Sequence, residues 1–435
     1  MANGLILKGQ TLTFTNDPFL VGSAAATKFD TSGAVWVDGG RIKDFGTAND
    51  ILGKAAGVPV IDYGESLISA GFVDCHVHYP QLPIIASYGE QLLEWLERYT
   101  FPCESTFGDQ KYARKVADTF LKECLANGTT TAAVFASVHP QSVDAFFEAA
   151  TELGLRMACG KVMMDRNAPE YLLDTAETSY EHSKKLLQKW HKIGRNIYAI
   201  TPRFAPTSSP EQLRAAGTLW REYPDALMQT HLSENVDEIK LVRELFPEEE
   251  DYLAVYETYG LLGPGAIFGH AIHLSQRERD ALRDSGSAVA HCPTSNMFIG
   301  SGLFDAVGLR GVSPRIPVGL ASDVGGGSSL SMFSTMRAAY ETAQLRGHSL
   351  HPAKLWYMAT IGSAQAMQLD DCIGNLTPGM EADLIVLDLE STSLIETRVL
   401  NARDIWDVLF AQIILADDRA VKATFAGGRL VWERD

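Results

Sequence analysis

Through the middle of the chain, apolar stretches of strand length alternate with segments whose apolar residues recur at helical spacing. The apolar stretches lie at 67–77, 130–138, 155–164, 197–204, 226–231, 266–274, 288–292 and 316–321. Helical spacing occurs, for example, at 113–126, 143–153, 176–192, 211–222 and 330–345. Strands that alternate with helices predict a parallel sheet, and strands that are apolar throughout predict a sheet covered on both faces. Eight such strands over ~300 residues favour a (β/α)8 barrel of the TIM type over the competing doubly wound open sheet.

Short β segments separated by Gly-rich turns occupy both ends of the chain. They lie at 4–7, 12–15, 34–37 and 58–62, and again at 382–387, 420–425 and 430–432. Neither end has enough strands to form a stable sheet by itself. We therefore expect the two ends to combine into one small β-sandwich domain, with its N-terminal part at 1–66, the barrel at 67–375 and its C-terminal part at 376–435.

Composition and charge exclude several classes of protein. The 435 residues are 46% hydrophobic, and the formal net charge of −17 argues against nucleic-acid binding, which needs a basic surface. No apolar run approaches the 18 residues of a membrane span, and the first residues lack the pattern of a secretory signal. None of the six cysteines belongs to a C-x-x-C motif. We therefore expect free thiols in a reducing compartment and a cytoplasmic location.

The end of the first apolar stretch contains a His-x-His motif, formed by His76 and His78. Residues two apart on a strand point to the same side, so both imidazoles are expected to project together into the mouth of the barrel. Two neutral imidazoles make half of a site for zinc or a similar divalent metal. The motif alone does not distinguish a metal site from two unrelated histidines.

Three further side chains of metal-ligand type lie at the ends of later strands. His231 closes the fifth strand, His270 lies late in the sixth, and Asp323 closes the eighth. Barrel active sites form at the C-terminal ends of the strands. Any one of these residues could be a hydrogen-bonded core residue, but the set favours one divalent ion held by His76, His78, His231 and Asp323. Such an ion directs a water molecule at an electrophilic carbon, which predicts a metal-dependent hydrolase.

Residues that follow three of the strands predict a substrate pocket beside this metal. Glu234 lies three residues after one metal-ligand histidine, and Gln81 lies three residues after another. Arg203 and Phe204 leave the fourth strand between two prolines, and a planar cation beside a ring suits a flat, hydrogen-bonding heterocycle. The alternatives are a solvated loop residue for Glu234 and a surface charge for Arg203.

The absence of a lysine from the fourth strand favours one metal ion over two. Barrels that bind two metals commonly bridge them through a modified lysine at that position. Lys161, on the third strand, is the remaining nearby candidate.

These motifs resemble the amidohydrolase superfamily and, within it, the barrel-type guanine deaminases, over nearly the whole chain. The His-x-His motif and the aspartate of the eighth strand are common to the superfamily. The stretch Leu-Glu-Trp-Leu at 93–96 with Tyr-Thr-Phe-Pro at 99–102, and the Arg-Phe pair at 203–204, are much more specific to guanine deaminases. Further resemblance lies at 231–234, at 290–296 and at 322–324.

The resemblance implies hydrolytic deamination of guanine to xanthine and ammonia in purine catabolism, with one zinc ion per chain. It implies zinc ligation by His76, His78, His231 and Asp323. It implies that Glu234 shuttles protons, that Asp323 and His270 act on the attacking water, and that Gln81, Arg203, Phe204 and His231 contact the purine. It also implies a barrel with a β-sandwich from both termini, and a homodimer.

Two positions depart from the common pattern, and three rival functions stay open. Ala70 and Ala271 stand where proline and glycine are frequent, and His273 is close enough to His270 to exchange roles with it. The rivals are another deaminase or chlorohydrolase of the superfamily, a two-metal cyclic-amide hydrolase, and a binding protein on a retired enzyme scaffold. The other deaminase fold, with H-x-E and P-C-x-x-C motifs, is excluded because Cys103 is followed three residues later by Thr106 and no histidine precedes a glutamate by two residues.

Overall fold

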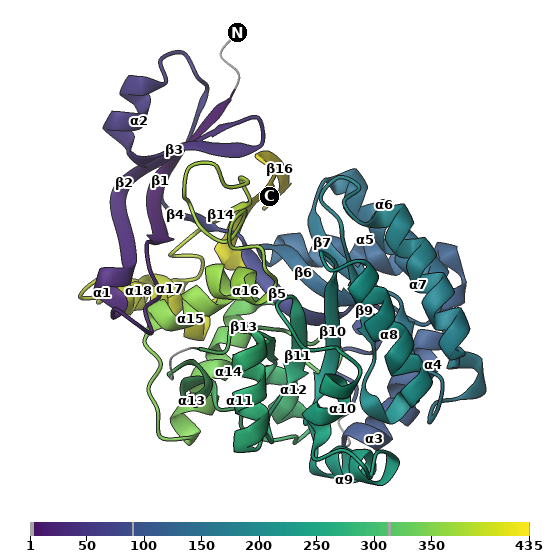
Figure 1. Cartoon of the computed structure of the whole chain (residues 1–435). Helices are drawn as coiled ribbons and strands as arrows, with labels where there is room; N and C mark the ends of the chain where they lie inside the picture. Colours follow the sequence, from purple (N-terminus) through teal and green to yellow (C-terminus); the bar gives the residue numbers. More distant parts are fainter. Residues whose placement is uncertain (1–3, 89–90, 312–314, 435) are drawn as a thin grey trace.

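The computed structural model describes residues 4–88, 91–311 and 315–434, which form a barrel and a separate sheet beside it (Figure 1). Neighbouring strands of the barrel pair in parallel, and almost all of their residues are buried, as their apolar sequences predict. In chain order these strands are β5 (Phe72–His78), β6 (Thr129–Phe135), β7 (Arg156–Gly160), β9 (Ile197–Pro202), β10 (Leu227–Leu232), β11 (Ala266–His270), β12 (Ala288–His291) and β13 (Val318–Leu320). A two-residue strand, β8 (Val162–Met163), pairs with β9 off this path.

Backbone hydrogen bonds join the first strand of the barrel to the segment that follows the last. The Asp323 N–H donates to the His76 carbonyl at 2.9 Å, and the His78 N–H donates to the Val324 carbonyl at 2.8 Å. A doubly wound open sheet would leave its edge strands apart, so these bonds exclude that alternative and confirm the barrel. They also bring three of the expected metal ligands to one point.

Helices cover the outside of the barrel where helical spacing predicts them. The five expected helices are α5 (Gln110–Ala126), α6 (Pro140–Leu153), α7 (Ala176–Trp190), α8 (Pro210–Glu222) and α14 (Met332–Leu345). The side chains of Asp109, Thr175 and Ser209 accept backbone N–H groups at the starts of α5, α7 and α8, and such caps stabilise a helix by about 1 kcal/mol each. Among the described residues, no helix combines the length and the apolar character needed to cross a membrane.

The remaining helices are shorter and lie in the connections or beside the terminal sheet (Figure 1). They are α1 (Ser23–Ala26), α2 (Ala48–Lys54), α3 (Leu92–Trp95), α4 (Phe101–Glu104), α9 (Val236–Leu245), α10 (Tyr252–Thr258), α11 (Gln276–Ser285), α12 (Pro293–Phe298), α13 (Ala306–Arg310), α15 (Pro352–Ala359), α16 (Ile361–Ala366), α17 (Ser393–Val399) and α18 (Ile405–Leu415). A π-helical turn, 96–100, connects α3 to α4 in the long segment after β5.

The strands of the two termini combine into one unit, as expected, and they form a single seven-stranded sheet. Its order is β16 (Arg429–Glu433), β15 (Val421–Ala426), β14 (Leu384–Leu387), β4 (Val60–Ala70), β1 (Leu5–Phe14), β2 (Thr27–Asp38) and β3 (Arg41–Thr47). The N-terminal and C-terminal strands meet where β14 pairs antiparallel with β4, with Val386 opposite Ile68. Figure 1 shows strands from both ends of the chain together in this part of the molecule. The domain boundaries at 66/67 and 375/376 stay predictions.

The apolar stretch 67–77 contributes to both parts of the molecule. Its first residues end β4 of the terminal sheet, and the chain passes at Gly71 into β5 of the barrel. A side chain at Gly71 would collide with the side chain of Thr130 on β6, which explains the glycine at this crossing. A continuous apolar run thus contains two strands that two different sheets bury.

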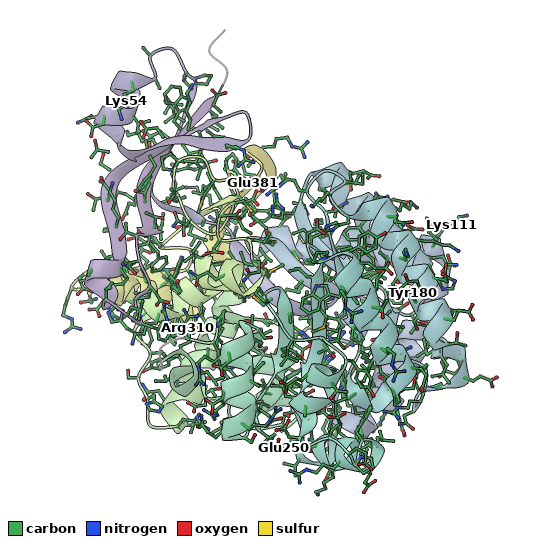
Figure 2. The ribbon with its side chains drawn as sticks, viewed as in Figure 1. Lys54, Lys111, Tyr180, Glu250, Arg310 and Glu381 are labelled. Carbon is green, nitrogen blue, oxygen red and sulfur yellow. The ribbon has the colours of Figure 1, made fainter. Side chains whose placement is uncertain are left out.

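Ion pairs connect the terminal sheet to the barrel. Glu381 accepts hydrogen bonds from Arg156 Nε at 2.8 Å and from Arg195 Nε at 2.9 Å, and Arg195 also pairs with Asp383. Figure 2 shows Glu381 at the junction of the two parts. Since these carboxylates are largely buried, removal of one partner would leave a charge without compensation.

Candidate active site

Three histidines and one aspartate meet at the C-terminal end of the barrel. The Nε2 atom of His78 lies 3.3 Å from Nε2 of His76 and 3.2 Å from Nε2 of His231. The Oδ1 atom of Asp323 lies 3.4 Å from Nε2 of His76 and 3.5 Å from Nε2 of His78. All four side chains are buried. The four residues expected to bind the metal therefore converge, although they come from β5, from β10 and from the segment after β13.

The hydrogen bonding of His231 decides which of its nitrogens faces the cluster. Its Nδ1 lies 2.7 Å from the carbonyl oxygen of Arg203. A carbonyl only accepts, so Nδ1 carries the proton and Nε2 presents a lone pair to the other ligands. Burial lowers the pKa of His76, and it lowers the pKa of His78 and His231 well below the ordinary imidazole value. The three rings are therefore neutral, as metal ligands must be.

Asp323 supplies the carboxylate of the cluster. Burial by itself raises its pKa, but the hydrogen bond with His76 and the nearby imidazoles outweigh burial and lower the pKa to about 2. Three neutral imidazole nitrogens and one carboxylate oxygen are a donor set that suits a borderline divalent ion such as zinc. The chemistry of the donors thus fits a metal at this point.

His270 ends β11 beside the cluster. Its Nδ1 lies 2.8 Å from the amide oxygen of Asn296, which makes Nδ1 the donor. Its Nε2 then faces the carboxylates, 3.6 Å from Oδ2 of Asp323 and 3.4 Å from Oε2 of Glu234. His273 instead has its Nε2 2.9 Å from the backbone carbonyl of Ser301. The structure therefore places His270, and not His273, between the two carboxylates.

Glu234 is buried beside His270 and is not a solvated loop residue. Its Oε1 accepts a hydrogen bond from Ser301 Oγ at 3.1 Å, and its backbone N–H donates to Glu238 at 2.9 Å. Burial raises the pKa of Glu234 to about 7. Burial lowers the pKa of His270, but the carboxylates of Glu234 and Asp323 outweigh it and raise that pKa overall. A carboxyl group with this pKa can both donate and accept a proton near neutral pH.

The backbone is strained at the ends of the strands that carry these groups. His270, Ala271, Asp323 and Ser233 have φ angles of 66°, 48°, 48° and 46°, in the left-handed region that non-glycine residues rarely adopt. Strain of this kind gathers at functional sites, where the surrounding fold holds it in place. It also explains why glycine is frequent at the position of Ala271, because glycine adopts such an angle without a steric cost.

Gln81, Arg203 and Phe204 form one wall of the adjoining cavity. Arg203 is 2% exposed, so the surface-charge alternative is excluded. Its Nη1 donates to Oε2 of Glu104 at 2.7 Å, and Gln81 Nε2 donates to Oε1 of the same carboxylate at 3.0 Å. The guanidinium lies 5.9 Å from the centre of the Phe101 ring. A flat ligand here would meet the N–H donors of Arg203 and Gln81 at its edge and the ring of Phe204 beside it.

The cavity also has apolar lining residues, most of which come from the segment after β5. These residues are Leu92, Trp95 and Leu96, of which the last two belong to the motif at 93–96, together with Ile299 from the end of α12. The remaining lining residues are His78, Gln81, Arg203, Phe204, His231, Glu234, His270, Ser295, Asp323 and Gly326. The site thus has an apolar face, a polar edge and a metal-ligand cluster at its base, which is the general form of a small-molecule site.

Comparison with known proteins decides the family. The amidohydrolase family matches residues 67–431. Guanine deaminase of Escherichia coli K12 is 48% identical over 413 residues, which cover 95% of this chain and 94% of that protein. The chain belongs to the guanine deaminases of the amidohydrolase family. The E. coli guanine deaminase structure has a TM-score of 0.96 at 46% identity and covers 99% of this chain and 100% of its own. The structure of the guanine deaminase from C. acetobutylicum, with guanine bound in its active site, has a TM-score of 0.89 at 28% identity and covers 99% and 100%.

Three polar residues of this guanine deaminase site were not assigned a role from the sequence. Asn296 belongs to the stretch 290–296 that carries part of the resemblance, but nothing in its spacing links it to His270. Ser301 and Glu104 lie in connecting segments, without a periodic pattern that would point to the cavity. Glu104 lies two residues after the motif at 99–102, and this position beside a family-specific segment is the one signal that could have indicated it.

Lys161 does not belong to the cluster of expected metal ligands in this guanine deaminase fold. Its buried ammonium group pairs with Asp174 and donates to the Val162 carbonyl at 3.1 Å. An ammonium group held in an ion pair is not a carbamate ligand. The structure therefore offers no support for a bridging role of Lys161.

Proposed function

We propose that this chain hydrolyses guanine to xanthine and ammonia, with one zinc ion held by His76, His78, His231 and Asp323. The observation that carries the proposal is the buried edge formed by Arg203 and Gln81, on the same cavity as the metal-ligand cluster. This edge presents hydrogen-bond donors, and guanine carries a carbonyl oxygen at C6 and its leaving amine at C2. The guanine-bound relative supports the same assignment.

The chain's own residues then divide the remaining tasks. When bound, zinc would supply a nucleophilic hydroxide near neutral pH by lowering the pKa of a water. Asp323 accepts the proton of the attacking water, and His270 orients that water between the two carboxylates. Glu234 in its protonated form donates to ring nitrogen N3, which makes C2 electrophilic enough for attack. Asp323 then returns the proton taken from the water to the amine, which leaves as ammonia, and Glu234 takes up the proton of the C2 hydroxyl as the carbonyl forms, so that guanine and water become xanthine and ammonia.

Arg203, Gln81 and Phe204 hold the purine while this occurs. The donors of Arg203 and Gln81 bond to the carbonyl edge, and Phe204 packs on the ring. A cavity that excludes water strengthens each of these polar interactions. His231 contributes both to the metal site and to the cavity wall.

A substrate panel tests the proposal against other deaminases of the superfamily. Purified protein is incubated separately with guanine, adenine, cytosine and ammeline, and released ammonia is assayed. We expect guanine to give the highest kcat/KM by at least about tenfold, because a site built to hydrogen-bond a substrate group discriminates against analogues without it. Faster ammonia release from adenine, cytosine or ammeline than from guanine would contradict the proposal. Absence of ammonia release from all four compounds would favour a binding protein.

We further propose that the protein is a cytoplasmic homodimer. Guanine deaminases are usually homodimers, and none of the six cysteines, all within the described residues, forms a disulfide. Light scattering of the purified protein should give twice the chain mass of 47.5 kDa. A mass equal to that of one chain at micromolar concentration would contradict the dimer. Cell fractionation tests the location.

A further inference from the structure

A buried carboxylate lies directly behind the polar wall of the cavity. Glu104 ends α4, is 0% exposed, and does not line the cavity itself. Each of its oxygens accepts from a different residue of that wall, Oε2 from Arg203 and Oε1 from Gln81. We propose that Glu104 is a positioning residue, which aims the donors of Arg203 and Gln81 at the 6-carbonyl oxygen of the purine. This inference rests on the function proposed above.

The directions of the hydrogen bonds determine how Gln81 faces the substrate. A carboxylate oxygen only accepts, so the Gln81 amide must turn its NH2 group towards Glu104. The Gln81 Oε1 then accepts from the Gly325 N–H at 3.4 Å. One N–H of Gln81 remains for a ligand. With Glu104 absent, the amide could turn over and present an acceptor to the purine carbonyl, which would repel it.

The same carboxylate compensates the charge of Arg203. A guanidinium that is 2% exposed is costly without a partner, and Glu104 provides an opposite charge at 2.7 Å. The Nη1 bond and the contact with the Phe101 ring hold the guanidinium in one orientation. A guanidinium presents its N–H donors in one plane, so it recognises a carbonyl group specifically only when that plane is held in a fixed orientation. Glu104 therefore acts on affinity for a 6-carbonyl group, and not only on the stability of the fold.

Two ligands that are not deamination substrates separate these effects. Hypoxanthine has the 6-carbonyl group and lacks the 2-amino group, whereas purine lacks both. We measure the ratio of their dissociation constants by calorimetry, in the zinc-loaded parent and in Glu104→Gln. The substituted amide retains one acceptor oxygen and presents an NH2 group to the other donor. We expect the preference for hypoxanthine over purine to fall on the order of 10-fold in Glu104→Gln, because a hydrogen bond to a buried polar group is lost.

A matched variant controls for the general loss of a buried ion pair. Asp174→Asn removes the carboxylate that pairs with buried Lys161, away from the cavity. Its thermal stability should fall while its hypoxanthine-to-purine preference stays at the parent value. Glu104→Gln in a background that carries both Arg203→Met and Gln81→Met should change the preference little further, since both positioned groups are already absent. A preference in Glu104→Gln equal to that of the parent would overturn the proposal and leave Glu104 with a structural role.

A second variant covers the case in which Glu104→Gln does not fold. Glu104→Asp keeps the charge and draws the oxygens back by one carbon–carbon bond, so the preference must fall in this variant also, and an unchanged preference overturns the proposal. Guanine turnover of the parent is measured separately. A parent that binds hypoxanthine selectively but releases no ammonia from guanine would refute the proposed function while the binding ratio still tests Glu104. If the parent bound hypoxanthine and purine with nearly equal dissociation constants, the role of the polar wall itself would be overturned.

Discussion

Replacement of Glu234 by glutamine tests the acid–base chemistry at its most sensitive point. Glu234 lies 3.4 Å from His270 Nε2 and accepts a hydrogen bond from Ser301 at 3.1 Å. In Glu234→Gln the amide oxygen can still accept from Ser301, and the new NH2 group can donate to His270 Nε2. The substitution therefore fits the cavity and removes little except the ability to transfer a proton.

The size of the effect follows from the role of the proton. General acid–base catalysis contributes about 10²- to 10⁴-fold, which corresponds to roughly 3–5 kcal/mol of the activation barrier. We expect kcat in Glu234→Gln to fall by on the order of 10²-fold or more while zinc content stays normal. Because burial raises the pKa of Glu234 to about 7, the proton-donating form is lost as the pH rises through that value. Parent turnover should then decline above neutral pH, and this decline should be absent in Glu234→Gln.

The assay combines xanthine formation from pH 5 to 9 with elemental analysis of each preparation. Glu278→Gln is the matched control, because Glu278 is a buried carboxyl that caps α11 outside the cavity. Its kcat at neutral pH should stay within about twofold of the parent, as for a substitution remote from the reacting atoms. Turnover near the parent value in Glu234→Gln with zinc present would remove Glu234 from the mechanism. A fall in kcat that accompanies loss of zinc would refute the claim that Glu234 transfers protons without contributing to metal binding.

Three further predictions concern the metal and the purine. Elemental analysis should find about one zinc per chain, with activity lost to a chelator and restored by zinc, and two tightly bound ions would contradict the single site. Arg203→Ala should lower guanine kcat/KM by on the order of 10- to 1000-fold with normal zinc content, whereas Arg114→Ala, which breaks an exposed ion pair, should not. Phe204→Ala should mainly raise KM, because packing on the ring stabilises bound substrate and transition state alike; a fall in kcat with unchanged KM would refute this.

Much of the fold and the convergence of the expected metal ligands could be predicted because the relevant signals are local. Apolar stretches alternating with helical spacing indicate a parallel sheet wherever they occur, and the carboxyl ends of such strands meet on one side. His76 and His78 share a face because they are two residues apart on one strand. His231 and Asp323 join them because each lies at the carboxyl end of its own strand. The pattern could not show that 67–77 serves two sheets, because apolar character reports burial and not the partner that provides it.

The sequence by itself therefore determined the class of fold, the ligand types at the strand ends and, by resemblance, the family. Only the tertiary structure decided which connecting residues complete the site. Glu104 and Arg203 are separated by 99 residues and meet because α4 packs against the turn 79–84 that follows β5, which brings Glu104 to the residue that follows β9. His270 rather than His273 faces Glu234 because of a left-handed backbone turn at the end of β11. Side-chain periodicity is a property of neighbouring residues, whereas such contacts depend on strand register and on loop paths, which the whole fold sets.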